Sequence, residues 1–136
     1  MKAPRMVRSE LSLHMQVAAY LRRAMPQPDF PVLWWHTPNG EKRDQRTAAK
    51  LRAMGVLPGV ADFEFIMPNG QAAFLELKSA TGALSAEQEQ FRDRVRANGC
   101  GYATARTLEE AVVILERWLA AYGLQPRARL SRRIAA

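Results

Sequence analysis

Two acidic residues and a lysine stand where the sequence otherwise predicts buried β-strands. Asp62 lies in the apolar run 59–66, and Glu76 and Lys78 close the run 72–78. Burying an ionised carboxylate is costly unless it is paired or binds a metal ion. Two carboxylates and a lysine that converge on one sheet face would form a divalent-metal site for phosphodiester cleavage. An edge salt bridge between Lys78 and one acid is the alternative that the spacing leaves open.

The segment between the two runs predicts that these side chains meet. Pro68-Asn69-Gly70 has the composition of a three-residue hairpin loop, with proline at an early turn position and glycine at its end. If the residues that flank this loop pair, Asp62 stands directly opposite Glu76, where Cβ atoms are about 4.5–5.5 Å apart. Glu76 and Lys78 are two residues apart and therefore share a face. A slip of one residue would turn Asp62 to the other face.

Length and composition predict one domain with a hydrophobic core. The chain has 136 residues, 48% of them hydrophobic, and this length suffices for a core. No apolar run approaches the roughly 20 residues of a membrane span, and the basic N-terminus lacks the apolar stretch of a secretory signal. Cys100 is the only cysteine, which excludes an intramolecular disulfide and a zinc-binding cysteine cluster. We expect a cytoplasmic protein without membrane contact.

The charge of the chain predicts a polyanionic partner. The net charge is +7, and residues 123–136 contain four arginines and no acid. Basic clusters suit a phosphate backbone, although a solvated face and a flexible tail would explain the same charge. The basic residues that we expect to contact nucleic acid are Lys42, Arg43, Arg46, Lys50, Arg127, Arg129, Arg132 and Arg133.

Apolar periodicity and chain breakers predict alternating helices and strands. We expect helices at about 10–25, 44–54, 86–98 and 107–122, and strands at about 30–37, 59–66, 72–78 and 100–105. The order α-β-α-β-β-α-β-α predicts a single α/β domain, residues 1–122, in which helices flank a central mixed sheet. Residues 123–136 would form a basic, flexible C-terminal tail.

The first predicted helix carries a third acidic residue. Ser9 is a suitable N-cap for a helix that begins at Glu10, and Glu10 then falls in the apolar stripe of Leu13, Val17 and Leu21. A carboxylate on that face needs a partner, which a metal ion or Lys78 would supply. Alternatively, Glu10 only favours the positive N-terminal end of the helix.

Two later helices begin with capping boxes, in which a hydroxyl and an acidic or amide side chain satisfy backbone donors reciprocally. Ser85 and Gln88 open the helix at 86–98, and Thr107 and Glu110 open the helix at 107–122.

The ordered set of these pieces resembles the virus-type replication-repair nuclease (VRR-NUC) domain of the PD-(D/E)xK nuclease superfamily. The resemblance extends from about residue 10 to residue 119. Ala61 departs from the family pattern, which usually has proline there, and that proline shapes the backbone rather than the chemistry. The matching pieces are Glu10, 36–40, 54–56, 58–59 with Asp62, 76–78, and 82–85 with Gln88.

The resemblance implies a restriction-endonuclease-like fold and a set of roles. Glu10, Asp62 and Glu76 would ligate Mg²⁺ or Mn²⁺ with the backbone carbonyl of Leu77, and oxygen ligands of this kind favour hard cations. Lys78 would orient or deprotonate the attacking water. Two further matching residues are Gln88, which would help to hold the site unless it only caps its helix, and Asn39, which joins the expected nucleic-acid contacts.

The resemblance also implies an activity. Stand-alone domains of this kind resemble structure-selective DNA endonucleases that act as homodimers on four-way (Holliday) junctions, here in a bacterial or phage-infected cell. A flap or replication-fork nuclease and an RNA nuclease are alternatives with the same chemistry. A DNA-binding protein without catalysis is the alternative of another class. His14 and His36 are assigned no catalytic role and are expected to be packed or solvated.

Overall fold

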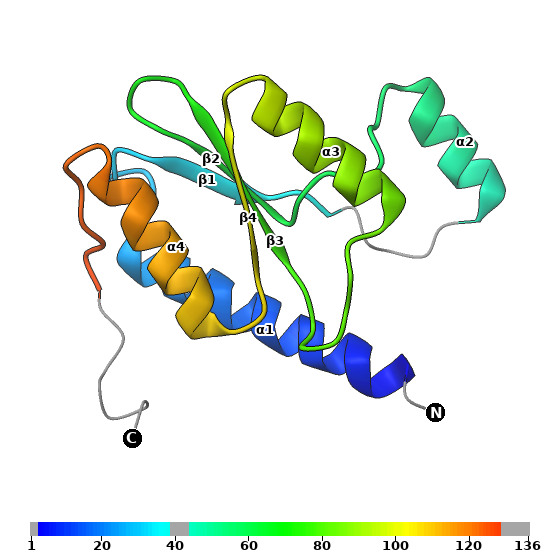
Figure 1. The fold of residues 1–136 in the computed structure, drawn as a ribbon, viewed down its shortest axis with the longest axis horizontal. Coiled ribbons are helices and arrows are strands. Elements are labelled where there is room, and N and C mark those ends of the chain that lie inside the picture. Colours follow the sequence, from blue (N-terminus) through cyan, green and yellow to red (C-terminus); the bar gives the residue numbers. More distant parts are fainter. Residues whose placement is uncertain (1–2, 39–43, 129–136) are drawn as a thin grey trace.

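The computed structural model describes residues 3–38 and 44–128, with side chains from Glu10 onward. Within these ranges the chain forms a four-stranded mixed sheet with helices on both faces (Figure 1). The predicted α/β class and element order are confirmed. The helices are α1 (Ala3–Ala24), α2 (Gln45–Ala53), α3 (Ala86–Ala97) and α4 (Leu108–Ala120), and the strands are β1 (Leu33–His36), β2 (Phe63–Ile66), β3 (Ala72–Leu77) and β4 (Gly101–Ala105).

The β2–β3 hairpin has the predicted register. The strands lie in the order β1-β2-β3-β4, with antiparallel β1–β2 and β2–β3 pairs and a parallel β3–β4 pair. Phe63 pairs with Leu75, and the Met67 N–H donates to the Gln71 carbonyl at 2.9 Å to close the three-residue loop. Gly70 ends the loop with φ +86°, a conformation that glycine adopts without a Cβ penalty.

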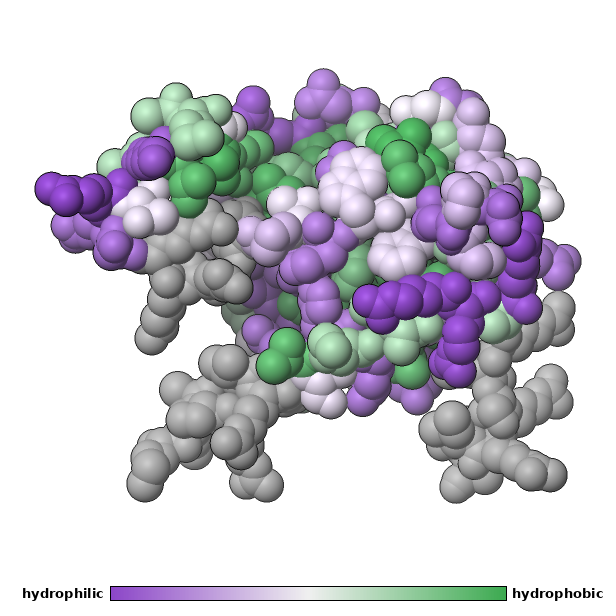
Figure 2. Space-filling view, turned by 180° about the vertical axis from the view of Figure 1, so that it is seen from behind, coloured by the Kyte–Doolittle hydropathy of each residue, from purple (hydrophilic) through white to green (hydrophobic). Residues whose placement is uncertain are grey.

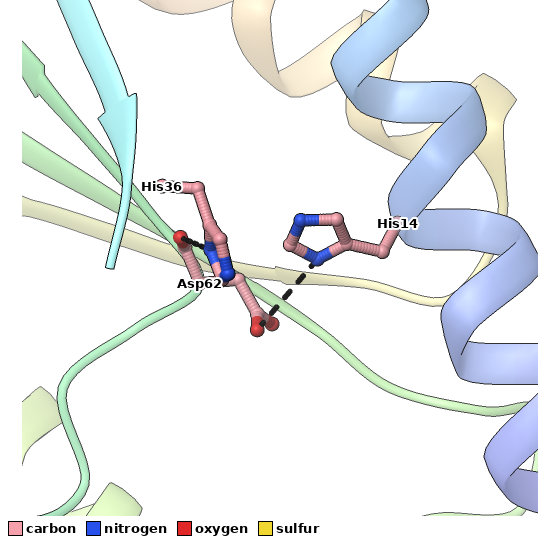
Figure 3. Close-up of side chains that lie close together, drawn as sticks. All are labelled: His14, His36 and Asp62. Atoms are coloured by element: carbon pink, nitrogen blue, oxygen red, sulfur yellow. Dashed lines mark hydrogen bonds and ion pairs between the residues drawn. The ribbon is translucent and has the colours of Figure 1, made fainter. Parts of the chain in front are cut away.

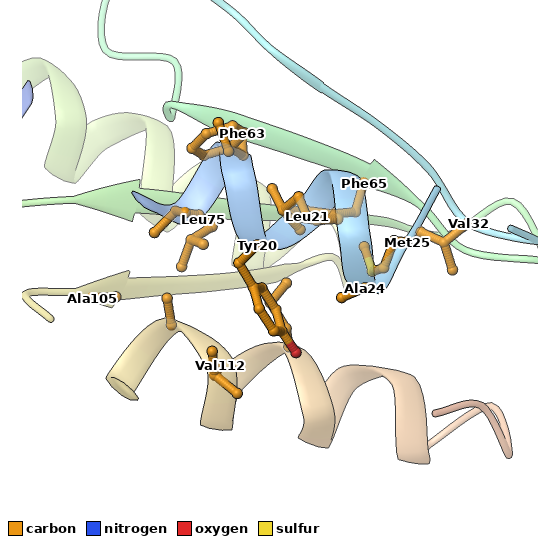
Figure 4. Packing of buried hydrophobic residues seen from close by; sticks show 14 of the residues in the cluster. Tyr20, Leu21, Ala24, Met25, Val32, Phe63, Phe65, Leu75, Ala105 and Val112 are labelled. Carbon is orange, nitrogen blue, oxygen red and sulfur yellow. The ribbon is translucent and has the colours of Figure 1, made fainter. Parts of the chain in front are cut away.

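Each face of the sheet is covered by its own helices. The larger core lies between the sheet and the pair α1 and α4, where Tyr20, Leu21 and Phe65 are almost fully buried (Figure 4). On the opposite face, α3 packs Phe91 and Val95 against the sheet (Figure 1). The predicted apolar stripe of α1 is therefore confirmed, because its residues point into the larger core.

Three predicted boundaries are wrong. Strand β2 begins at Phe63 and not at residue 59, because Gly59 has a φ of +84°, which does not fit the extended backbone of a strand. Helix α1 begins at Ala3, so Ser9 lies inside the helix and does not cap it. Pro4 is compatible with a first helical turn, and the residues between Pro4 and Ser9 do not interrupt the helix. Strand β1 begins at Leu33, although Phe30 and Val32 are buried. Buried apolar residues alone do not distinguish a strand from the packed loop that precedes it.

The helix caps follow the sequence closely. Ser85 and Gln88 form the predicted capping box at α3. At α4, the Thr107 hydroxyl accepts from the Glu110 N–H, as predicted, but the Glu110 carboxylate accepts from the Arg106 N–H at 2.7 Å. The Glu110 carboxylate therefore bonds to the N–H of the residue before the N-cap and not to that of the N-cap Thr107 itself.

The first residues after α4 lie against the domain. Leu124 packs on the larger core, and the Arg127 N–H donates to the Ala24 carbonyl at 2.8 Å. The Arg127 guanidinium also lies 5.8 Å from the centroid of the Phe30 ring. The domain boundary at residue 122 stays a prediction. Six of the predicted nucleic-acid contacts lie outside the described residues, namely Asn39, Lys42, Arg43, Arg129, Arg132 and Arg133.

Among the described helices, none combines the length and the apolar character needed to cross a lipid bilayer.

Gly59 brings the chain before β2 against the first turn of α3. Its φ is +84°, and a Cβ at this position would collide with the backbone of Glu87 and Gln88. Gly70 has a similar φ of +86° but open space around it. We predict that Gly70→Ala lowers the free energy of unfolding by about 1 kcal/mol, from φ alone, and Gly59→Ala by about 2–4 kcal/mol, because overpacking is added. Chemical denaturation of the two variants checks this; equal losses would contradict the close approach at Gly59.

Candidate active site

A cavity of about 540 Å³ opens beside the carboxyl end of β3. Helix α2 and the first turn of α3 line its other sides. The cavity wall includes all five residues predicted to be catalytic and the predicted backbone ligand: Glu10, Asp62, Glu76, Leu77, Lys78 and Gln88.

Glu76 is the most buried of these polar residues, with a relative exposure of 3%. Its Oε1 accepts a hydrogen bond from Gln88 Nε2 at 3.1 Å and lies 3.9 Å from Lys78 Nζ. Its Oε2 is buried and has no hydrogen-bond partner among the described residues. Burial, followed by the nearby Asp62 carboxylate, raises the pKa of Glu76 to about 8, and Lys78 offsets part of this shift.

Asp62 lies one residue before β2 and continues the hairpin register toward Glu76. Its Oδ2 accepts from the Leu77 N–H at 2.7 Å, so the predicted meeting of Asp62 with 76–78 is observed. Burial raises the pKa of Asp62, while the Leu77 hydrogen bond and the charges of His14, His36 and Lys78 act in the opposite direction. Two neighbouring carboxyl groups thus have raised pKa values, in both cases mainly because burial disfavours the ionised form.

Glu10 connects α1 to the loop that follows β3. Its Oε1 accepts from the Ser79 N–H at 3.1 Å. The same loop is held from β4 by Arg106, whose Nη1 donates to the Ser79 and Gly82 carbonyls at 2.6 Å. Glu10 therefore faces the cavity from a fixed position, although the structure brings no Lys78–Glu10 ion pair within the described residues.

Gln88 has both of the roles that the sequence left as alternatives. Its Oε1 accepts from the Ser85 N–H at 2.9 Å, which completes the capping box. Its Nε2 donates to Glu76 Oε1. The cap thereby fixes the amide that holds the buried carboxylate.

The donor set suits a hard divalent cation. Glu76 Oε2 is buried without a hydrogen-bond partner among residues 3–38 and 44–128, and two more carboxylates lie on the same wall. A positive ion in the cavity would bind these oxygens and lower the raised pKa of Glu76. Carboxylate and carbonyl oxygens are the ligands that Mg²⁺ and Mn²⁺ prefer. Glu10, Asp62, Glu76 and the Leu77 carbonyl are the groups on this wall that would hold it.

Sequence reasoning missed the proximity of the two histidines to the site. His14 Nδ1 lies 3.9 Å from Asp62 Oδ1, and the two imidazole centroids are 4.3 Å apart. His14 is half-buried and stacks on Phe63, as the packed alternative predicted, but it also faces the acid. A signal was present, because Glu10 and His14 are four residues apart and share a helix face.

Exposed cations on α2 and exposed apolar groups on the segment after it lie near the cavity. Arg46 and Lys50 are exposed, consistent with their predicted contact to a polyanion, and Arg52 lines the cavity itself. Hydrophobic side chains gather at the upper left of Figure 2. Met54 and Val56, which follow α2, are exposed. Helix α2 and the segment after it thus present cationic and apolar side chains near the carboxylates.

The fold is that of VRR-NUC domains. A solved structure described as a "VRR_NUC domain protein" superposes with a TM-score of 0.67 at 17% sequence identity, covering 82% of this chain and 88% of that one. The predicted resemblance is thereby confirmed at the level of the fold. No protein-family model matches the sequence, and no curated protein sequence matches it.

Glu76 should make the metal-free protein less stable as the pH rises. A carboxyl group in the unfolded chain ionises near its ordinary pKa of 4.5, whereas in the folded protein the pKa is about 8. Because the folded state keeps the proton in this interval, the contribution of Glu76 to stability should be greatest below pH 4.5 and fall as the pH rises to 8. We predict that Glu76→Gln abolishes this loss and, at pH 8, raises the free energy of unfolding by about 1–3 kcal/mol.

Chemical denaturation in EDTA at pH 5 and pH 8 measures this effect. Glu116→Gln, which changes an exposed carboxylate on α4, is the control and should leave the pH dependence unchanged. Added Mg²⁺ should stabilise the wild-type protein at pH 8 but not Glu76→Gln. A wild-type protein whose stability is flat between the two pH values would contradict the buried charge.

Proposed function

We propose that the protein is a Mg²⁺- or Mn²⁺-dependent nuclease of the PD-(D/E)xK type that hydrolyses phosphodiester bonds in DNA. The observation that carries this proposal is Glu76, whose buried Oε2 has no hydrogen-bond partner in the described part of the chain although Asp62 and Lys78 lie beside it. The similarity of the fold to a VRR_NUC domain protein supports the same chemistry.

Each residue of the site has a proposed role that follows from its charge and position. Glu10, Asp62 and Glu76 would bind the cation, which when bound supplies positive charge against the scissile phosphate and makes water a better nucleophile. Lys78 is a half-buried point charge at the end of β3, suited to orienting or deprotonating the attacking water and to stabilising the charge that develops on the phosphate. Gln88 keeps the Glu76 carboxylate in place.

The basic surface of α2 suits the phosphate backbone that must enter the cavity. Arg46 and Lys50 would contact phosphates beside the scissile one, and Arg52 lies on the cavity wall. A branched DNA such as a four-way junction is the proposed substrate, and a two-fold homodimer would present two such sites to symmetric strands. A flap or fork substrate fits the same active site.

Cleavage of synthetic DNA tests the activity directly. A four-way junction, a flap, a linear duplex and a single strand are incubated with Mg²⁺, Mn²⁺ or EDTA. Symmetric, metal-dependent nicks near the junction are expected. Metal-dependent cutting of another substrate would reassign the substrate, and binding without cutting under every condition would favour a DNA-binding protein without catalysis.

Chemistry and DNA binding should be separable at the site. We predict that Asp62→Asn and Lys78→Ala each lower the cleavage rate by at least about a hundredfold, because they remove a cation ligand and the point charge at the reacting phosphate. DNA affinity, measured by fluorescence anisotropy with Ca²⁺ in place of Mg²⁺, should change much less. Thr107→Ala, which removes the α4 cap and does not line the cavity, is the control and should keep most of the activity. Unchanged cleavage in Lys78→Ala would contradict its role.

The arginines of the C-terminal segment should contribute to binding through charge alone. Replacing Arg129, Arg132 and Arg133 by glutamine leaves intact the packing of Leu124 and the Arg127 contact with Ala24. We predict weaker DNA binding and a flatter dependence of log Kd on log salt concentration, with a slope change of up to about 3, because fewer counterions are released. An unchanged slope would show that these side chains do not touch phosphate.

A further inference from the structure

The two histidines of this chain meet at one carboxylate beside the nuclease site. The whole sequence contains only His14 and His36. His14 extends from α1 and His36 from the end of β1, and both face Asp62, which precedes β2 (Figure 3). Three separate segments therefore bring two imidazoles and one carboxylate together.

The spacing of these groups matches a cation site better than a direct hydrogen bond. One ligand atom from each of the three side chains lies within 4.8 Å of the other two. The gap between His14 Nδ1 and Asp62 Oδ1 is 3.9 Å, beyond the about 2.7–3.2 Å of a direct hydrogen bond. Any two ligand atoms of a tetrahedral ion lie about 3.3 Å apart when the metal–ligand bonds are about 2.0–2.1 Å long. The three side chains would move closer together to bind one ion.

Both imidazoles are held in fixed orientations by contacts on their other sides. His36 Nδ1 lies 2.6 Å from the backbone carbonyl of Asp62. A carbonyl oxygen only accepts, so Nδ1 carries the proton and Nε2 of the neutral ring keeps its lone pair. This is the arrangement typical of metal-ligating histidines, in which one ring nitrogen donates to an oxygen and the other binds the metal. His14 is stacked on the Phe63 ring with centroids 4.7 Å apart.

We propose that His14, His36 and Asp62 form a second cation site, which binds a transition-metal ion such as Zn²⁺, Co²⁺ or Mn²⁺. Imidazole nitrogens favour these ions, whereas Mg²⁺ prefers oxygen ligands. The two oxygens of Asp62 face different partners, since Oδ2 accepts from Leu77 on the Glu76 side and Oδ1 faces His14. Asp62 is thus the shared ligand between a hard-cation site and a histidine-containing site.

A small hollow next to His14 leaves room for further ligands. It has a volume of about 170 Å³ and is lined by Glu10, Leu11, His14, Asp62 and Leu77. Three protein ligands leave at least one position open on a four-coordinate ion, and water or a phosphate oxygen entering this hollow would fill it. The second ion would therefore lie where it also touches the substrate side of the site.

The experiment is a Zn²⁺ titration of the full chain, purified without a histidine tag, followed by NMR of the imidazole nitrogens and protons. With two histidines in the sequence, His14→Gln and His36→Gln assign every imidazole signal. Both sets of signals should shift together as the first equivalent of Zn²⁺ is added, and excess Mg²⁺ should not reverse the shift. Imidazole signals that do not shift with Zn²⁺, or shifts that Mg²⁺ reverses, would contradict the proposed site.

Affinity measured by calorimetry gives an independent result. Each single histidine substitution should weaken Zn²⁺ binding by more than about tenfold, the lower bound seen when a supporting partner of a ligand is lost. Circular dichroism checks that each variant is folded, and the exposed position of His36 makes His36→Gln the safer of the two. Two folded variants that bind Zn²⁺ as the wild-type protein does would refute the proposal.

Glu76→Gln separates this inference from the proposed nuclease function. It removes a ligand of the hard-cation site but none of the three proposed here, so the Zn²⁺-induced shifts of both histidines should persist in it. If Glu76→Gln abolishes these shifts, the ion lies among the carboxylates and the histidine site is wrong. The site would stand even if no DNA were cleaved, since its test uses Zn²⁺ alone.

Discussion

The structure of the site depends on one buried carboxyl group at the end of β3. Glu76 is excluded from water, and its only neutralising neighbour within ion-pair distance is Lys78 among the described residues. A buried carboxylate in this position is unfavourable by itself, as its raised pKa shows. Two surrounding elements contact this part of the chain. The first turn of α3 provides Gln88, which donates to Glu76. The chain before β2 places Asp62 so that its Oδ2 accepts from the N–H of Leu77, the neighbour of Glu76.

The same constraint explains features that lie farther from the chemistry. Gly59 lets the chain pass against the backbone of Glu87 and Gln88. The segment that leads to Asp62 therefore packs directly on the turn that carries the Gln88 amide. Arg106 fixes the loop after β3, and Glu10 accepts from that loop at Ser79. The three carboxyl groups are therefore each held by a hydrogen bond to a neighbouring element. This arrangement keeps them in place for a cation.

The sequence was sufficient for the parts of the fold that local chemistry determines. Pro68-Asn69-Gly70 fixed the loop length, and loop length fixed the register that brings Asp62 toward Glu76. The start of α1 was mispredicted because Ser9 has cap chemistry, whereas the preceding residues propagate a helix equally well. The second bond of Gln88 and the meeting of His14 with His36 depend on how separate elements pack, and no spacing within one segment reveals that.

Asp62 is the residue at which these constraints combine. One of its oxygens is fixed by the Leu77 N–H on the side of Glu76, and the other faces the histidines on the side of α1. Its carboxylate is partly buried, and burial raises its pKa despite three nearby cationic or titratable groups. Positive charge on either side would stabilise its ionised form. Because both sides then act on the same carboxylate, an ion held by the histidines would change how firmly Asp62 binds a cation beside Glu76.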